Sequence, residues 1–443
     1  MDLSRRSFLA ANSAALGSAL LPGGLLAAVN ARTPSLPSLD DWGAVRALFP
    51  LSREYLHLSG FFLASHPEPV RAAIEGLRRA IDDNPFLVVD HGLFATESEN
   101  MQREVRSDLA DYLGGRQEDI ALTGSTTASL TLVYHGLALG PRDEILTTVH
   151  DHFVHHESIR LAQLRNGAQV RKIALFDSAA DASVDAIVAR VRAGIRPETR
   201  VLGVTWVHSS TGIRLPIRAI AAALLEINHA RSDAERVLLV VDGVHAIGAV
   251  NETISTLGAD FFCAGTHKWL FAPRGTGIIW APAPSWARLR PVSPSFSDRE
   301  SFDAWAQNRP PAGPTTAARV TPGGFTAFEH QWAMGAAVRL HQRIGRVRIA
   351  ARITELNQRC KDGLAEISKV TLHTPRDATL SAGVNCFEVE GLPADEVVAR
   401  LLEKRIIASA SPYAVPYARL SAGLMNTPEE VDQAIAAVRA IAS

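Results

Sequence analysis

The chain has few cysteines, no excess of charge of either sign, and no long apolar run after its N-terminal region. Its three cysteines have the spacing of neither a disulfide framework nor a metal-binding motif. The 45 basic and 46 acidic residues nearly cancel, which excludes a general attraction to nucleic acid or to an anionic membrane surface. A chain of 443 residues exceeds what one hydrophobic core supports, so we expect a globular protein of two domains.

The N-terminus carries the pattern of an export signal. The pair Arg5-Arg6 precedes a moderately apolar stretch that Pro22-Gly23-Gly24 interrupts, and small residues near Ala31 offer a cleavage site. Residues 1–31 therefore resemble a twin-arginine signal peptide, and the alternative is an N-terminal membrane anchor. The internal break and the polar residues in the stretch disfavour an anchor. We expect the twin-arginine export machinery to carry the folded protein to the periplasm.

Between about residues 118 and 290, short apolar runs alternate with helical segments. This alternation predicts an α/β fold, in which a large domain contains a mostly parallel, doubly wound sheet. The tail predicts a small α+β C-terminal domain, preceded by one long helical segment over 328–364. Residues 294–323 are rich in Pro, Ser, Gly and Thr and predict a linker or loop. The expected boundaries are a signal peptide over 1–31, an N-terminal segment packing with the small domain over 32–65, a large domain over 66–298, and the linker and small domain over 299–443.

Two apolar runs each lead to a charged residue. The run Val237–Val241 predicts a buried strand that delivers Asp242 at its C-terminal end, where open α/β sheets bind their ligands. The run Phe261–Ala264 leads to Lys268, which three large apolar residues follow. A buried lysine is costly unless it is neutralised, paired or covalently bonded. Pyridoxal 5'-phosphate (PLP) uses both residues, because the lysine holds it as a Schiff base and the carboxylate faces its pyridinium nitrogen. The alternative is a strand-end aspartate and a surface lysine.

Two further stretches could contact such a cofactor. Ser125 and Thr126 open an apolar helix directly after a predicted strand, and helix N-termini with hydroxyl groups bind phosphate. An ordinary helix N-cap explains them equally well. The stretch His150–His156 is rich in histidine and supports three interpretations: a ring that stacks on a flat cofactor, a metal site, or an ordinary polar loop.

Four other residues are candidates for the same site. Ser209 ends another predicted strand, and its hydroxyl could reach the cofactor's phenolate oxygen or shape a turn. His245 could donate to the same oxygen or be a core histidine, and His267 could contact the phosphate. Arg419 lies on a short strand of the small domain, where a guanidinium could bind a substrate carboxylate through two parallel hydrogen bonds. The alternative for Arg419 is a surface position.

Together these residues resemble the aminotransferase class V family of fold-type I PLP enzymes, from about Tyr55 to the C-terminus. The most specific element is the tetrapeptide Asp242-Gly243-Val244-His245, followed by the motif over 267–277. The sequence His267-Lys268-Trp269-Leu270-Phe271-Ala272-Pro273-Arg274-Gly275 is similar to isopenicillin N epimerase-like members rather than to cysteine desulfurases.

The resemblance implies roles for individual residues. Lys268 corresponds to the Schiff-base lysine and Asp242 to the pyridinium partner, which makes them the expected catalytic pair. Ser125 and Thr126 correspond to the phosphate-binding residues, and Arg419 to the arginine that grips the substrate α-carboxylate. The position of the stacking ring best matches His152, with His150 and Phe153 as alternatives.

The chain also departs from the family pattern. Gly265 stands where many relatives have a phosphate-binding serine, and residues 323–326 stand where many have a Gly-Thr contact from the partner subunit. Thr266 or Thr326 could replace those contacts. No cysteine falls in a loop suited to persulfide chemistry, which disfavours a desulfurase.

The family implies an enzyme that acts at Cα of a small amino-acid-like or peptide substrate, and implies a homodimer. Transamination, epimerisation and elimination all begin with loss of the Cα proton, and the sequence does not distinguish them. Exported members resemble periplasmic PLP enzymes that tailor siderophores of the pyoverdine type. The alternatives are a cysteine desulfurase-like or β-eliminating lyase, and a non-catalytic periplasmic protein that binds PLP or metal. Retention of Lys268, Asp242 and Arg419 together argues against a non-catalytic protein.

Overall fold

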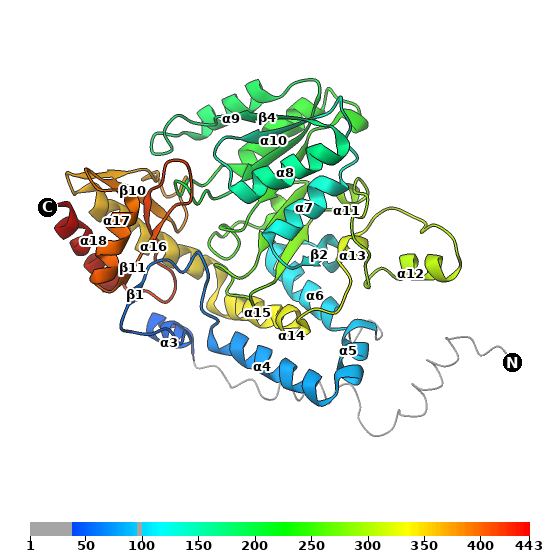
Figure 1. Ribbon diagram of the computed structural model, residues 1–443, viewed down its shortest axis with the longest axis horizontal. Coiled ribbons are helices and arrows are strands. Elements are labelled where there is room, and N and C mark those ends of the chain that lie inside the picture. The colour runs from blue at the N-terminus through cyan, green and yellow to red at the C-terminus, as the bar shows by residue number, and fades with distance from the viewer. Residues whose placement is uncertain (1–37, 95–99) are drawn as a thin grey trace.

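The computed structural model describes residues 38–94 and 100–443, which form two regions with separate sheets (Figure 1). The predicted signal peptide over 1–31 lies outside the described residues. The larger region contains a seven-stranded sheet, and the smaller one, at the left of Figure 1, contains a four-stranded sheet. In the described part of the chain, no helix combines the length and the hydropathy that crossing a membrane requires.

The large sheet has the strand order β2-β8-β7-β6-β5-β3-β4. Its strands are β2 (Ile120–Thr123), β3 (Glu144–Thr148), β4 (Gln169–Ile173), β5 (Thr199–Thr205), β6 (Leu238–Asp242), β7 (Phe261–Gly265) and β8 (Gly277–Trp280). β8 runs opposite to the other six strands of this sheet, which are parallel to one another, so the prediction of a mostly parallel sheet is confirmed. Every residue of the central strands β6 and β7 is buried, which explains why they read as continuous apolar runs.

Helices cover both faces of this sheet. Alternate residues of β6 enter different cores: Val240 packs with α7 and α8, whereas Leu239 and Val241 belong to the core that includes α6, α9 and α10. The helices of this region are α4 (Glu68–Asp83), α5 (Pro85–Phe94), α6 (Met101–Leu113), α7 (Thr126–Gly136), α8 (Phe153–Asn166), α9 (Val184–Gly194), α10 (Ile217–Asn228) and α11 (Ala283–Trp286), with short 3-10 turns at Gln117–Asp119, Asp233–Glu235 and Ile254–Thr256. The doubly wound prediction is therefore confirmed.

Two predictions of local structure need correction. The predicted single helix over 328–364 is three helices: α14 (Phe328–Trp332), α15 (Met334–Ile344) and α16 (Arg346–Ala365). Gly345 separates the last two with a φ of 95°, a left-handed conformation that glycine adopts without steric cost. The predicted loop over 294–323 contains α12 (Arg299–Ala306) and α13 (Ala317–Val320), and α12 stands away from the main body in Figure 1.

The small region combines an antiparallel sheet with helices. Its strand order is β12-β13-β10-β9, with β9 (Val370–Leu372), β10 (Asn385–Val389), β12 (Ser409–Ala410) and β13 (Ala418–Leu420). The helices α16, α17 (Ala394–Glu403) and α18 (Pro428–Ala442) pack on it. The N-terminal segment joins this region, because β1 (Leu56–His57) pairs in parallel with β11 (Ile406–Ile407). Helix α3 (Trp42–Ala47) contributes Arg46, which forms an ion pair of 2.6 Å with Glu430 of α18.

Candidate active site

The central strands of the large sheet bring the two charged residues of the sequence motif together. Asp242 is the last residue of β6, and Lys268 follows the adjacent parallel strand β7 by three positions. In the sheet register, Asp242 lies opposite Cys263 of β7. Because both strands end at the same edge, the carboxylate and the amine lie in the place where open α/β sheets bind ligands.

Asp242 is a buried carboxylate that no basic side chain of the described residues pairs with. It is 4 % exposed, and its Oδ1 accepts a hydrogen bond of 3.1 Å from the Val244 N–H. Burial raises the pKa of Asp242 to about 6, more than this hydrogen bond and the charge of Lys268 lower it. A cationic ring nitrogen placed against this carboxylate would supply the missing partner.

Lys268 also lacks an ion-pair partner: in the described part of the chain, no carboxylate contacts its amine. Its Nζ lies 3.0 Å from Nε2 of His245, which is itself buried. Burial lowers the pKa of Lys268 to about 8, and the charge of Asp242 only partly opposes this effect. Burial also holds the pKa of His245 well below its ordinary value, so the imidazole is neutral and its Nδ1 is buried without a hydrogen-bond partner. The lowered pKa makes the neutral, nucleophilic form of the amine available at mildly alkaline pH.

The N-terminus of α7 lies beside this lysine and offers an anion site. The Ser125 hydroxyl caps the helix by accepting from the Ala128 N–H at 3.1 Å, and the Thr126 hydroxyl accepts from the Gly265 N–H at 2.7 Å. A Cβ added to Gly265 would lie 2.9 Å from Cε1 of His267 and 3.0 Å from Oγ1 of Thr126. These residues therefore surround one point at the N-terminus of α7. The first turn of this helix contains no acidic residue, so no side chain there would repel an anion.

This crowding also explains one departure from the family pattern. A serine at position 265 would require the His267 ring to shift, so glycine leaves the room that this ring occupies. Thr266 is fully buried and bonded to the Thr276 hydroxyl at 2.6 Å, which makes it a poor substitute as a phosphate ligand. Arg274, which the sequence reasoning did not select, acts electrostatically on His267 and lowers its pKa, although burial and Lys268 contribute more.

Of the three candidates for the stacking ring, the structure places His152 beside the site. His150 instead stacks on Phe176, with ring centroids 3.8 Å apart, and its Nε2 accepts from the Leu175 N–H. Phe153 is 70 % exposed. The half-buried His152 caps α8, and its pKa is lowered first by burial and then by the charges of Lys268 and Arg419.

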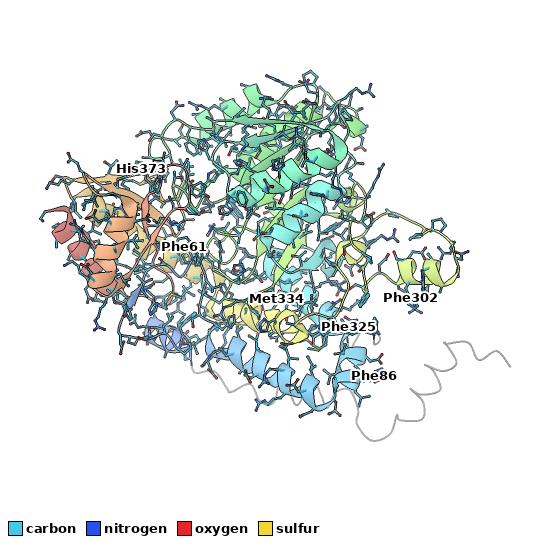
Figure 2. All side chains as sticks on the ribbon, viewed as in Figure 1. Phe61, Phe86, Phe302, Phe325, Met334 and His373 are labelled. Carbon is cyan, nitrogen blue, oxygen red and sulfur yellow. The ribbon has the colours of Figure 1, made fainter. Side chains whose placement is uncertain are left out.

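Arg419 provides a buried cation at the border of the two regions. Three of its five N–H groups donate to Ser409 Oγ, to the Ser209 carbonyl and to the Ala410 carbonyl, at 3.2, 3.0 and 2.8 Å. Its guanidinium lies 4.8 Å from the ring centroid of Phe61, which Figure 2 labels where the small region meets the large sheet. Within the described ranges, no carboxylate forms an ion pair with it. One N–H remains on each terminal nitrogen, which leaves a fork for a carboxylate.

The structure adds two residues that the sequence reasoning missed. Phe61 contacts both Arg419 and His245, and Tyr413 bonds to the hydroxyl of Ser209 at 2.9 Å. The sequence leaves two roles open for Ser209, a contact with the cofactor's phenolate oxygen or the shaping of a turn, and in the structure its hydroxyl bonds to Tyr413. Neither aromatic residue belongs to a periodic pattern, because both lie in turns that only the tertiary fold brings to the site.

The histidine-rich stretch does not converge on one point. His155 bonds to the Tyr134 hydroxyl at 2.6 Å, and His156 bonds to the Thr148 carbonyl at 2.7 Å. Among residues 38–94 and 100–443, no group of three or more His, Cys, Asp and Glu side chains is arranged to hold a metal ion. The metal interpretation of this stretch therefore gains no support from the geometry.

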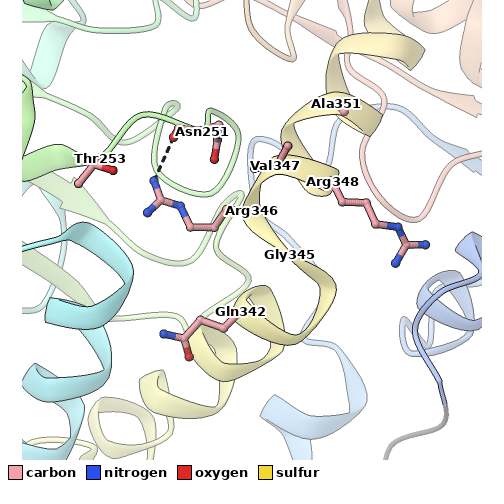
Figure 3. Close-up of a pocket in the computed structure, with 8 residues that line it drawn as sticks. All are labelled: Asn251, Thr253, Gln342, Gly345, Arg346, Val347, Arg348 and Ala351. Atoms are coloured by element: carbon pink, nitrogen blue, oxygen red, sulfur yellow. Dashed lines mark hydrogen bonds between the residues drawn. The ribbon is translucent and has the colours of Figure 1, made fainter.

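A surface groove of about 650 Å³ lies apart from these residues, at the junction of α15 and α16 (Figure 3). Arg346 lines it, and its guanidinium donates hydrogen bonds to the carbonyls of Tyr112, Asn251 and Glu252. Arg348, also at the groove, donates to the carbonyls of Leu39 and Asp40. These cations serve the fold, so we assign the chemistry to the Lys268 region.

Comparisons with known proteins identify the family of the chain. The aminotransferase class-V family matches residues 88–434. The chain is 30% identical to isopenicillin N epimerase of Streptomyces clavuligerus over 418 residues, covering 91% of this chain and 99% of that protein. It is 28% identical over 428 residues to a probable cysteine desulfurase of Xylella fastidiosa, covering 91% of this chain and 96% of that protein.

Solved structures show the same fold. The lysine-to-alanine mutant of C-DES, with glycine covalently linked to its PLP cofactor, superposes with a TM-score of 0.77 at 20% identity, covering 89% of this chain and 98% of that one. A cysteine desulfurase of Thermococcus onnurineus superposes with a TM-score of 0.73, covering 90% of this chain and 98% of that one. The predicted fold class is confirmed, and the chain belongs to the aminotransferase class-V family of PLP-dependent enzymes.

Proposed function

We propose that Lys268 holds PLP covalently and that the enzyme acts at Cα of an amino-acid-like substrate, as an epimerase, aminotransferase or lyase. The observation that carries the proposal is that Asp242 and Arg419, which are buried, and Lys268, which is half-buried, lie close enough to affect one another electrostatically and have no ion-pair partner among the described residues. Burying such groups unpaired is costly, and a ligand with an aldehyde, a basic ring nitrogen and a carboxylate-bearing substrate would satisfy all three.

When bound, PLP supplies an electron-accepting ring that stabilises negative charge at Cα. Asp242 holds the proton on the ring nitrogen, and its raised pKa shows that it gains most from a cationic partner. The Arg419 fork orients the substrate carboxylate, and the groups around α7 hold the phosphate. Burial lowers the pKa of Lys268 to about 8 in the cofactor-free chain, and as a free amine Lys268 would accept the Cα proton.

The absence of a suitable thiol favours epimerase or aminotransferase chemistry over desulfuration. Cys263, Cys360 and Cys386 are all buried. Burial raises the pKa of Cys360 and of Cys386 to about 12, so neither forms a thiolate at neutral pH. Persulfide formation needs an accessible thiolate as nucleophile. A β-eliminating lyase remains the second candidate, because elimination needs no cysteine of the protein.

A homodimer is part of the proposal. Large apolar side chains lie exposed on the side away from the small region, where Figure 2 labels Phe86, Phe302 and Phe325. Such patches are typical of interfaces. Phe325 also lies in the segment 323–326, where relatives place a contact from the partner subunit. We expect light scattering to report a dimer, and Phe325→Asp to shift it toward monomer. The control Leu402→Asp, at an exposed position of α17, should stay dimeric.

Export is the second part of the proposal, and its support is the Arg5-Arg6 pattern. In a chain of this family, that pattern favours a periplasmic substrate, and we propose an amino-acid-like group within a peptide siderophore of the pyoverdine type. Mass spectrometry of such a peptide after incubation with the enzyme in D2O would detect a mass change, because epimerisation exchanges the Cα proton for deuterium and transamination or elimination alters the side chain. An unchanged peptide, beside conversion of free amino acids, would contradict this substrate.

Borohydride reduction tests the cofactor assignment. The PLP-loaded protein should absorb visible light, and reduction should fix the cofactor to Lys268, where peptide mass spectrometry finds it. Lys268→Ala should abolish this attachment and turnover while keeping the fold. The matched control Lys361→Ala removes another buried lysine, which bonds to the Pro375 and Arg376 carbonyls, and should leave the attachment intact. A label on another lysine, or none after incubation with PLP, would refute the assignment.

A further inference from the structure

Tyr413 connects the hairpin that carries Arg419 to the large region. Tyr413 lies in the turn between β12 and β13, and Arg419 is the middle residue of β13. The Tyr413 hydroxyl is 2.9 Å from Oγ of Ser209, which follows β5 of the large sheet. Its ring packs edge-on against His152, with centroids 5.9 Å apart and an interplanar angle of 75°. This one side chain therefore contacts two residues at the border of the proposed substrate site.

Ser209 receives this hairpin at two points. Its carbonyl accepts a hydrogen bond of 3.0 Å from Arg419, and its hydroxyl bonds to Tyr413. Ser209 is only 7 % exposed, so water is poorly placed to replace either partner. The two bonds fix the hairpin, and with it the guanidinium, against the large region.

The rest of the turn gives no comparable anchor. Pro412 and residues 414–416 are exposed, whereas Tyr413 is half-buried. Burial raises the pKa of Tyr413 to about 12, so its hydroxyl keeps its proton throughout the neutral range. Tyr417, at the other end of the turn, instead stacks on His373 with centroids 3.8 Å apart.

We propose that Tyr413 is a positioning residue for the carboxylate clamp: its bond to Ser209 holds the Arg419 fork in the orientation that a substrate carboxylate requires. The inference rests on the function proposed for Arg419. A preformed fork loses less freedom when the carboxylate binds, so the hydroxyl contributes to substrate affinity without touching the reacting atoms.

The first test compares two ligands in the PLP-loaded enzyme. L-Alanine and ethylamine, which lacks the carboxylate, are titrated while the absorbance of the Lys268-bound cofactor is followed. Tyr413→Phe keeps the ring and removes the hydroxyl, and should weaken alanine binding about fivefold to tenfold, as expected for one hydrogen bond. Ethylamine binding should stay within about twofold, since only the fork is disturbed. Ser209→Ala should reproduce the effect, and the double variant should add nothing further.

The matched control is Tyr417→Phe, the same substitution on the same hairpin. It should leave both dissociation constants at their wild-type values. If Tyr413→Phe weakens alanine and ethylamine equally, or weakens neither, the hydroxyl does not position the clamp and the proposal is overturned.

Hydrogen exchange of the cofactor-free protein gives a second readout that needs no turnover. Amides of residues 411–419 should exchange faster in Tyr413→Phe and in Ser209→Ala, but not in Tyr417→Phe. Wild-type exchange in all three variants would overturn the connection between hairpin and sheet. Because this measurement uses no PLP, it separates the two proposals: failed borohydride labelling of Lys268 refutes the proposed function and leaves the exchange result to decide on Tyr413.

Discussion

Replacing Asp242 with asparagine should stabilise the cofactor-free protein and inactivate the loaded enzyme. Burial is the main reason why the pKa of Asp242 rises from 3.8 to about 6 in the folded chain. Below pH 3.8 the carboxyl is neutral in both the folded and the unfolded chain, so there is no charge to bury. Between pH 3.8 and about 6 the unfolded chain is ionised while the folded carboxyl keeps its proton, so stability falls as the pH rises through this range and the loss is complete above about pH 6.

The size of the effect follows from that difference in pKa. The gap between 3.8 and about 6 corresponds to about 3 kcal/mol of unfolding free energy at neutral pH. An asparagine oxygen can still accept the Val244 N–H, so the substitution removes the charge and keeps the hydrogen bond. We therefore expect Asp242→Asn to raise the free energy of unfolding by about 1–3 kcal/mol at pH 7 to 8, with the gain shrinking below pH 6.

Urea unfolding of the PLP-free proteins at several pH values measures this gain. The control is Glu144→Gln, a buried carboxylate that pairs with Arg171 at 2.8 Å and whose pKa is lowered, so its substitution should reduce stability at neutral pH. In the PLP-loaded enzyme the same substitution should be harmful, because asparagine cannot hold the proton on the ring nitrogen. Turnover should therefore fall by orders of magnitude. A loss of stability at pH 7, or an equal gain at pH 5 and pH 8, would refute the reasoning.

Three further predictions concern the remaining charged groups. Arg419→Lys should lose the preference for a carboxylate-bearing amine over its decarboxylated counterpart, because an ammonium lacks the planar fork. If the dissociation constants of the variant still show this preference, another cation binds the carboxylate. In the PLP-free protein, Lys268→Met should be more stable than wild type at pH 7, because the folded wild-type chain encloses a charged amine. Urea unfolding should show this difference in stability shrinking from pH 8 toward 10.5, where the unfolded chain binds a proton that the folded lysine lacks. Changing Arg5 and Arg6 to lysine should retain an unprocessed protein in the cytoplasm, which cell fractionation and N-terminal sequencing would show; equal periplasmic amounts of variant and wild type would contradict an export signal.

Much of the fold could be predicted because its signals are local. A parallel strand covered on both faces must be apolar at every position, so β6 and β7 stand out in the sequence as runs that end near a charged residue. The same reasoning selected Asp242 and Lys268, because burial next to such runs makes an unpaired charge conspicuous. The N-cap pattern of α7 likewise identified Ser125 and Thr126.

Other features could not be predicted because local pattern and tertiary packing disagree. The region 328–364 reads as one helix, yet its tertiary path turns at Gly345, where a left-handed backbone ends α15 before α16 begins. A helical pattern tolerates an isolated glycine, so the sequence gives no sign that this one breaks the helix. The segment 294–323 has loop composition, although α12 and α13 form within it.

The sequence by itself determined which groups are candidates for the chemistry, since a lysine and an aspartate after buried strands need partners that water cannot supply. Only the tertiary structure decided how these groups are completed. It placed His152, rather than His150 or Phe153, near Lys268, and it placed Phe61 and Tyr413 near Arg419. These contacts join residues far apart in the chain: the Ser209 hydroxyl meets a tyrosine 204 positions away. A periodic pattern records which face of an element is buried, but it carries no information about which distant side chain lies against that face.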